Sequence, residues 1–212
     1  MKFLYKMERK FGRFAIKNLM LHITILNAIV YLTSYLFTTF SLVSYMALVP
    51  NLVMQGQVWR IITYVFVPPN VSIILTAITL YFYYFIGLSL EHRWGSFKFN
   101  VYYLLGIILT AAASMISGYT IVGTYLNLSL FFAFAMLYPN MEVLFFFVIP
   151  IKVKYLAYFD AAFYAYVLIK GTPNDRIAII GSLLNFFIFF GPDIYKMIKL
   201  RIKVMKNRSR YR

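Results

Sequence analysis

The chain has 212 residues, of which 62% are hydrophobic and only 13% charged, and this composition excludes an ordinary water-soluble domain. At ~20 residues for each membrane span, the length holds five to seven spans and leaves no room for a separate soluble domain. The absence of cysteine excludes disulfides and cysteine nucleophiles, and the net charge of +15 comes from basic residues that flank hydrophobic segments, which favours lipid headgroups over nucleic acid as its partner.

Residues 1–18 are predicted to form an amphipathic basic segment on the cytoplasmic side of the membrane. Leu4, Met7, Phe11 and Phe14 are spaced three or four apart, and basic residues surround them. This pattern fits a helix lying in the headgroup layer and, equally, a basic flank that orients the first span. The apolar run at 19–40 is long for a signal peptide and no clear cleavage site follows it, so a retained first span is predicted.

The region 19–193 is predicted to hold six spans, which makes the fold an all-α polytopic membrane bundle. The stretch 41–70 is too long and too apolar for a simple connection, so an interfacial loop with short helices is expected there. A basic cytoplasmic tail, 194–212, follows the last span. The remaining spans are expected at about 71–90, 101–118, 123–138, 155–169 and 177–190.

The distribution of positive charge orients this layout. With both termini in the cytoplasm, 18 of the 21 Lys and Arg residues lie on the inner side of the membrane. Only Arg60, Lys170 and Arg176 would then lie outside. A multi-pass protein with both termini cytoplasmic is therefore expected.

Few polar residues are expected at membrane depth. Asp160 is the only acid there, and it is either a proton or ion site or a hydrogen-bonded structural carboxyl; the lack of a second acid favours the structural role. Asn127 and Asn185 are expected to hydrogen-bond neighbouring helices. His22 and His92 lie far apart without a carboxylate cluster, and no glycine-rich phosphate loop exists, so neither a metal nor a cofactor is expected.

Trp59, Arg60, Glu91 and Gly95 are predicted to organise the connections. Trp59 can lie at the headgroup level while Arg60 reaches phosphates or loop carbonyls. Glu91 is expected to cap the turn after the second span or to pair with the basic residues that follow it, and Gly95 suits a tight turn.

Three segments resemble motifs of the rhomboid superfamily. Residues 57–66, QVWRIITYVF, are similar to the G-x-x-W-R-x-x-T-x-x-F segment in the first loop of rhomboid proteases and derlins. Residues 87–96, GLSLEHRWGS, resemble the family's G-x-x-L-E-x-x-x-G-S turn, and residues 134–156 are similar to its fourth-span exit. The resemblance covers about half of the chain and implies a six-helix rhomboid-like bundle whose first loop is embedded in the outer leaflet.

The protease residues of that family have no match here. Its serine, in G-x-S-G at the start of the fourth span, falls at or beside Thr124, and its sixth-span histidine falls near Ile179. Ser117 and Ser129 are present, but one histidine lies near the inner end of its span and the other is cytoplasmic, so no base would be within reach. Thr124 and Ile179 are predicted to be vestigial catalytic positions.

The resemblance without these residues implies a non-catalytic protein, a pseudoprotease that binds transmembrane segments of other membrane proteins. Thr124, Asn127 and Asn185 would line its vestigial site, and membrane lipids would be further partners. Two alternatives stay open: an intramembrane serine-protease-like enzyme with an unconventional nucleophile, and a small transporter or channel subunit. Abundant Lys, Ile, Phe, Tyr and Asn suggest an AT-rich bacterial genome, and with it a location in the bacterial plasma membrane, as a cell-membrane protein.

Overall fold

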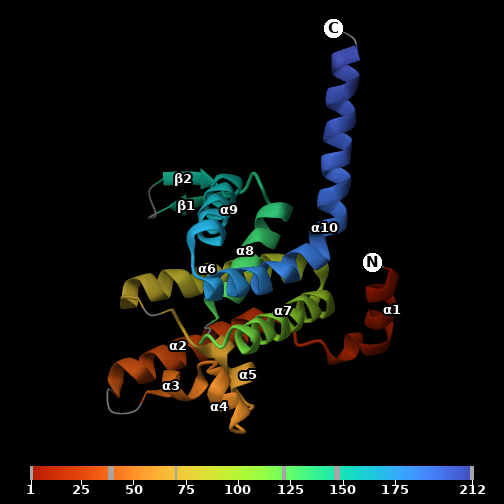
Figure 1. Cartoon of the computed structure of the whole chain (residues 1–212). Coiled ribbons are helices and arrows are strands. Elements are labelled where there is room, and N and C mark those ends of the chain that lie inside the picture. Colours follow the sequence, from red (N-terminus) through yellow and green to blue (C-terminus); the bar gives the residue numbers. More distant parts are fainter. Residues whose placement is uncertain (1, 38–40, 70, 121–122, 146–148, 211–212) are drawn as a thin grey trace.

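The computed structural model describes residues 2–37, 41–69, 71–120, 123–145 and 149–210 (Figure 1). In these ranges the chain is a helical polytopic membrane bundle, as predicted, with one two-stranded sheet. The helices before the sheet are α1 (Lys2–Phe11), η1 (Gly12–Phe14), α2 (Leu19–Leu36), α3 (Leu42–Met46), α4 (Pro50–Met54), α5 (Arg60–Thr63), η2 (Tyr64–Phe66), α6 (Ile73–Trp94), α7 (Ser96–Ser117) and α8 (Thr124–Leu137). The sheet and the helices after it are β1 (Glu142–Phe145), β2 (Ile149–Lys152), α9 (Val153–Lys170) and α10 (Pro173–Arg210).

Within the described ranges, four helical segments are long and apolar enough to cross a membrane: α2, α6, α7 and residues Asp175–Pro192 of α10. α8 is also apolar but has only 14 residues, about 21 Å of helix, which is shorter than the ~30 Å hydrocarbon core. α9 has 18 residues and carries Asp160 near its middle. These six segments correspond in order to the six predicted spans.

α7 is the central helix of the bundle. Its buried residues recur three or four positions apart and include Phe99, Tyr103, Gly106 and Thr110, so one broad face is directed inward. α7 contacts α6, α8 and α10, and α2 lies against α6. Figure 1 shows α2, α6, α7 and the first part of α10 side by side, with the sheet and α9 standing out to one side.

The sheet is a feature that the all-α prediction missed. β1 and β2 pair antiparallel, with Glu142 opposite Lys152 and Phe145 opposite Ile149. The backbone amide of Val153 donates to the carbonyl of Met141, which holds the start of α9 against the sheet. The two strands contain only eight paired residues. Such a short stretch has too little sequence periodicity to distinguish a β-hairpin from an irregular loop between two spans.

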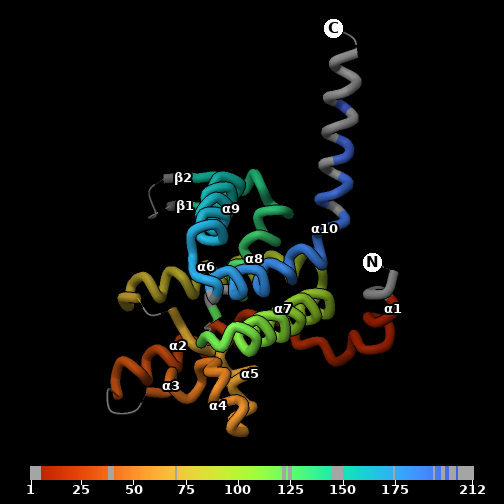
Figure 2. Tube along the Cα trace, in the orientation of Figure 1, coloured from red at the N-terminus to blue at the C-terminus, as the bar shows by residue number. Residues whose placement is uncertain are grey.

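The apolar part of the sixth span ends at Pro192, where the sequence predicts its end, but the helix itself continues. α10 runs without interruption from Pro173 to Arg210, with Pro192 inside it. Figures 1 and 2 show that the helix bends near this point and that its second part leaves the bundle. A proline removes one backbone hydrogen bond and kinks a helix, whereas the Lys- and Arg-rich residues beyond it favour helix strongly enough to continue it.

Candidate functional site

The first loop is packed onto the bundle through polar contacts. The Tyr64 hydroxyl donates to the carbonyl of Ile107 on α7 at 3.1 Å. Burial raises the pKa of Tyr64 above its usual value, so the hydroxyl keeps its proton and remains a donor. On the other side, the Asn27 amide of α2 donates to the carbonyl of Val65 at 3.1 Å. The loop is therefore an ordered part of the fold.

Arg60 lies inside this loop. Its side chain is 3% exposed, and Nη1 donates to the carbonyls of Ser44 at 2.7 Å and Ala47 at 2.8 Å. Nε donates to the side-chain oxygen of Gln57 at 2.8 Å. Trp59 beside it is half-exposed, with its indole N–H 3.4 Å from the carbonyl of Tyr45. The structure thus places Arg60 on loop carbonyls, and it joins the segment before α4 to α5.

Glu91 lies at the end of α6, where the chain turns into α7. It is 7% exposed, and its Oε1 accepts from the backbone amide of Asn18 at 2.8 Å and from the Ser96 hydroxyl at 2.6 Å. Gly95 has a φ of +83°, a conformation that favours glycine. One carboxylate therefore joins the start of α2 to the α6–α7 turn.

Glu91 was expected to cap the turn or to pair with the basic residues that follow it. The bond from Ser96 agrees with the first alternative, and the structure corrects the second. The Glu91 carboxylate is directed into the bundle toward α2, while Arg93 is exposed. Lys98 forms an ion pair with Glu8 of α1 at 3.3 Å. The physical reason is the position of Glu91 on the buried face of α6, where backbone and hydroxyl donors are within reach.

Replacing Glu91 by alanine is expected to lower the free energy of unfolding by about 1–2 kcal/mol, because the Asn18 amide and the Ser96 hydroxyl both lose the acceptor that this buried carboxylate provides. Unfolding in mixed detergent micelles, followed by circular dichroism, would measure this change. Glu142→Ala, at an exposed acid on β1, is the matched control and should change stability by less than about 0.5 kcal/mol. Equal effects of the two substitutions would contradict the role assigned to Glu91.

Segments carrying basic residues meet at one end of the bundle. The Glu8–Lys98 ion pair joins α1 to the start of α7. At the same end, the rings of Trp94 and Phe190 lie 5.7 Å apart, which places the bend of α10 beside the α6–α7 turn. Figure 1 shows the N-terminal helix and the bend of α10 on the same side.

A buried polar junction joins α7, α8 and α10. Asn185 is 0% exposed, and its amide donates to the carbonyl of Tyr102 at 3.1 Å and to the Ser129 hydroxyl at 3.3 Å. The hydroxyls of Tyr102 and Ser129 lie 2.5 Å apart. Asn185 thus forms the interhelical hydrogen bonds that were predicted for it, while Tyr102 was missed because the chain has 19 tyrosines and nothing in the sequence distinguishes this one.

The two positions predicted to be vestigial catalytic residues, Thr124 and Ile179, are not shown to form a common site. Ile179 is 1% exposed and packs inside the bundle. Thr124 begins α8, and its side chain lies outside the described residues. Both histidines, His22 and His92, are exposed, and among the described residues neither forms a hydrogen bond with a serine or threonine. Ser129 instead contacts the tyrosine and the asparagine of the junction.

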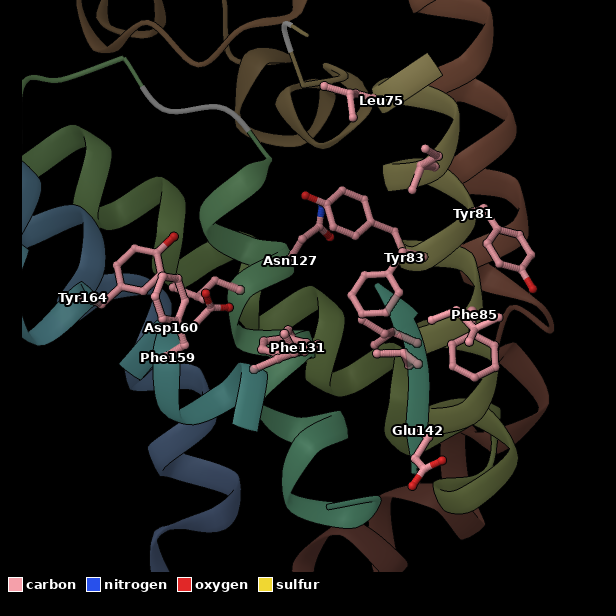
Figure 3. A pocket seen from close by; sticks show the side chains of 17 residues that line it. Leu75, Tyr81, Tyr83, Phe85, Asn127, Phe131, Glu142, Phe159, Asp160 and Tyr164 are labelled. Carbon is pink, nitrogen blue, oxygen red and sulfur yellow. The ribbon is translucent and has the colours of Figure 1, made fainter. Parts of the chain in front are cut away.

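A cavity of about 810 Å³ lies between α6, α8, α9 and β1 (Figure 3). Aromatic and aliphatic side chains make up most of its lining, and its polar groups include Asn127 of α8 and Asp160 of α9. Among the described residues, no group of three or more His, Asp or Glu side chains could hold a metal ion. This cavity was not predictable from the sequence, because its aromatic walls resemble every other lipid-facing surface.

Thr124, Asn127 and Asn185 were predicted to line one site. For the two asparagines this prediction is wrong, because they lie in different places. Asn127 lines the cavity, whereas Asn185 belongs to the junction with Ser129. Positions 127 and 129 are two residues apart, or about 200° around a helix, so they lie on opposite faces of α8. The cavity, rather than the vestigial catalytic position, is the candidate binding site.

Comparison with known proteins gives a family but no function. A family model described as "Eukaryotic integral membrane protein (DUF1751)" matches residues 19–188, which is most of the chain. No curated protein matches. The bacterial origin inferred from composition is wrong, because the family is eukaryotic. The location in a bacterial plasma membrane, which was inferred from that origin, is therefore wrong too. AT-rich composition is not confined to bacteria. The chain therefore belongs to the DUF1751 family of eukaryotic integral membrane proteins.

Proposed function

We propose that this chain is a non-catalytic, rhomboid-like membrane protein that binds a transmembrane helix of another membrane protein between α6, α8 and α9. The observation that carries the proposal is the cavity of about 810 Å³ at the depth of these helices, lined by side chains such as Phe82, Phe131 and Phe159. Concave, mostly apolar surfaces with a few polar groups are typical binding sites.

α9 forms a weakly held wall of this cavity. Its buried residues are Val153 and Ala157, both in its first two turns, while Phe163, Tyr166 and Ile169 further along are exposed. An element with few buried contacts moves at low cost in free energy. Outward movement of α9 would widen the cavity enough to admit one face of a helix.

The polar lining favours a helix over a lipid chain as the occupant. An acyl chain would fill the apolar part of the cavity and leave Oδ1 of Asn127 and the Asp160 carboxyl without a hydrogen-bond donor. A transmembrane helix can supply donors from its side chains, and such bonds hold helices together in lipid.

We infer that both termini are cytoplasmic and that the first loop lies in the opposite leaflet. Two observations support this orientation: 18 of the 21 basic residues fall on one side of the six spans, and the Glu8–Lys98 pair brings α1 to the same end as the bend of α10.

Site-specific photocrosslinking would test the binding site. Benzoylphenylalanine at position 159, which lines the cavity, is compared with the same probe at 166, which is similarly exposed but does not line the cavity. The partner is a tagged single-span reporter with a Leu/Ala transmembrane helix and one variable central residue. We expect about fivefold more reporter adduct from 159 than from 166, since a gain of ~1 kcal/mol changes occupancy by this factor.

A cavity-filling variant gives an independent control. Ile78→Trp adds volume to the wall formed by α6 and should lower the adduct from 159 without altering that from 166. Equal reporter adducts from the two positions, or lipid adducts alone at 159, would overturn the proposal.

A further inference from the structure

The cavity is acidic in a protein that is otherwise strongly basic. The chain has 21 Lys and Arg residues against 6 Asp and Glu residues. The described residues that line the cavity include Asp160 and Glu142 but no Lys, Arg or His. Glu142 is exposed at the β1 end, while Asp160 lies on α9 among aromatic side chains (Figure 3). This charge pattern is the reverse of that in the chain as a whole.

Asp160 has no partner within the described part of the chain. No hydrogen bond or ion pair joins its carboxyl to another described residue, although basic residues are abundant elsewhere. It is the eighth residue of α9, so about 10 Å of helix separates it from the β2 end. A carboxyl at this depth is costly unless it meets a cation or a hydrogen-bond donor.

Asn127 provides a second acceptor in the same cavity. It is 9% exposed, and its Oδ1 is buried without a hydrogen-bond partner among the described residues. The Tyr83 hydroxyl lies against the other side of the amide, and the Asn127 side chain points into the cavity (Figure 3). Asn127 is the fourth residue of α8, and both it and Asp160 line the same cavity.

We infer that the cavity recognises transmembrane helices that carry a lysine or arginine within the membrane. The cationic side chain would pair with the Asp160 carboxylate and donate a hydrogen bond to Oδ1 of Asn127. This inference rests on the proposed function and adds the chemical class of the partner helix. A basic side chain in lipid needs such a partner, and a carboxylate without an internal cation supplies one.

The reporter helices test this inference through their central residue. Three reporters are used, with Lys, Leu or Glu as the central residue. Each is crosslinked to the protein that carries the probe at position 159, both with Asp160 unchanged and with the substitution Asp160→Asn. We expect about fivefold more adduct with Lys than with Leu, and Asp160→Asn should remove this preference while the Leu adduct stays constant. Asp160→Lys should transfer the preference to the Glu reporter, a reversal that a general packing defect would not produce.

Glu8→Gln is the matched control, because it removes an acid that lies outside the cavity lining, and it should keep the Lys preference. Thermal unfolding of each variant in the same detergent verifies that Asp160→Asn, which preserves side-chain shape, is folded. Equal capture of Lys and Leu reporters at 159, above the level at 166, would overturn the inference and leave helix binding intact. Equal capture at 159 and 166 for every reporter would instead overturn helix binding itself.

Discussion

Replacing Arg60 by alanine is expected to lower the free energy of unfolding by about 3 kcal/mol. Arg60 is 3% exposed, and its guanidinium donates to the carbonyls of Ser44 and Ala47 and to the side-chain oxygen of Gln57. Hydrogen bonds to a charged group contribute ~1.5–3 kcal/mol, and the buried carbonyl of Ala47, which loses its donor, adds to the cost. Unfolding in mixed micelles, followed by circular dichroism, would measure the loss.

Two variants separate this effect from a simple loss of charge. Arg93→Ala removes an exposed arginine at the end of α6 and should change stability by less than about 0.5 kcal/mol. Arg60→Lys keeps the charge but not the planar donor geometry, so only part of the stability should return. An Arg60→Ala protein as stable as Arg93→Ala would show that the loop holds its shape without these hydrogen bonds.

The substitution Gly181→Ala is expected to destabilise the bundle by about 2 kcal/mol, because α10 lies too close to α7 for a side chain at this position. A Cβ at 181 would overlap the Cβ of Ala113 and would lie 3.4 Å from the carbonyl oxygen of Leu109. The Ala113 Cβ is fixed to the backbone and cannot rotate away, so the two helices must separate. Overpacking of this kind costs ~1–3 kcal/mol.

A second substitution on the facing helix provides the test. Ala113→Gly removes the atom that clashes, so the double variant should recover about half or more of the stability lost in Gly181→Ala, a coupling expected only for residues in contact. Gly191→Ala is the control on the same helix, since no atom lies within 4 Å of a Cβ there, and it should not lower stability. Additive losses in the double variant would contradict the close contact.

The sequence was sufficient to predict features that depend on hydrophobic length and charge. Six apolar segments and their order follow from the bilayer thickness, and the helical bundle confirms that fold class. An arginine in an apolar loop must find acceptors, so the contact of Arg60 with loop carbonyls was also predictable. These predictions needed only local properties of the chain.

Features that depend on packing between distant segments were not predictable. The separation of Asn127 from Asn185 arises from the rotation of α8 about its axis, and hydrophobicity around α8 is too uniform to reveal that rotation. The hydrogen bond of Glu91 with the backbone at the start of α2 depends on α2 and α6 being neighbours. A single sequence does not show which spans are neighbours. The cavity likewise lies between α6, α8, β1 and α9, which come from separate parts of the chain.

The bend of α10 affects how force passes between the two parts of this helix. Pro192 has no amide hydrogen, so the turn around it is the most compliant part of a helix that is otherwise continuously hydrogen-bonded. The Asn185 junction lies two turns before this point, inside the bundle. A protein or membrane surface that holds the basic tail can therefore tilt it as a lever about Pro192, while the packing of the spans stays unchanged.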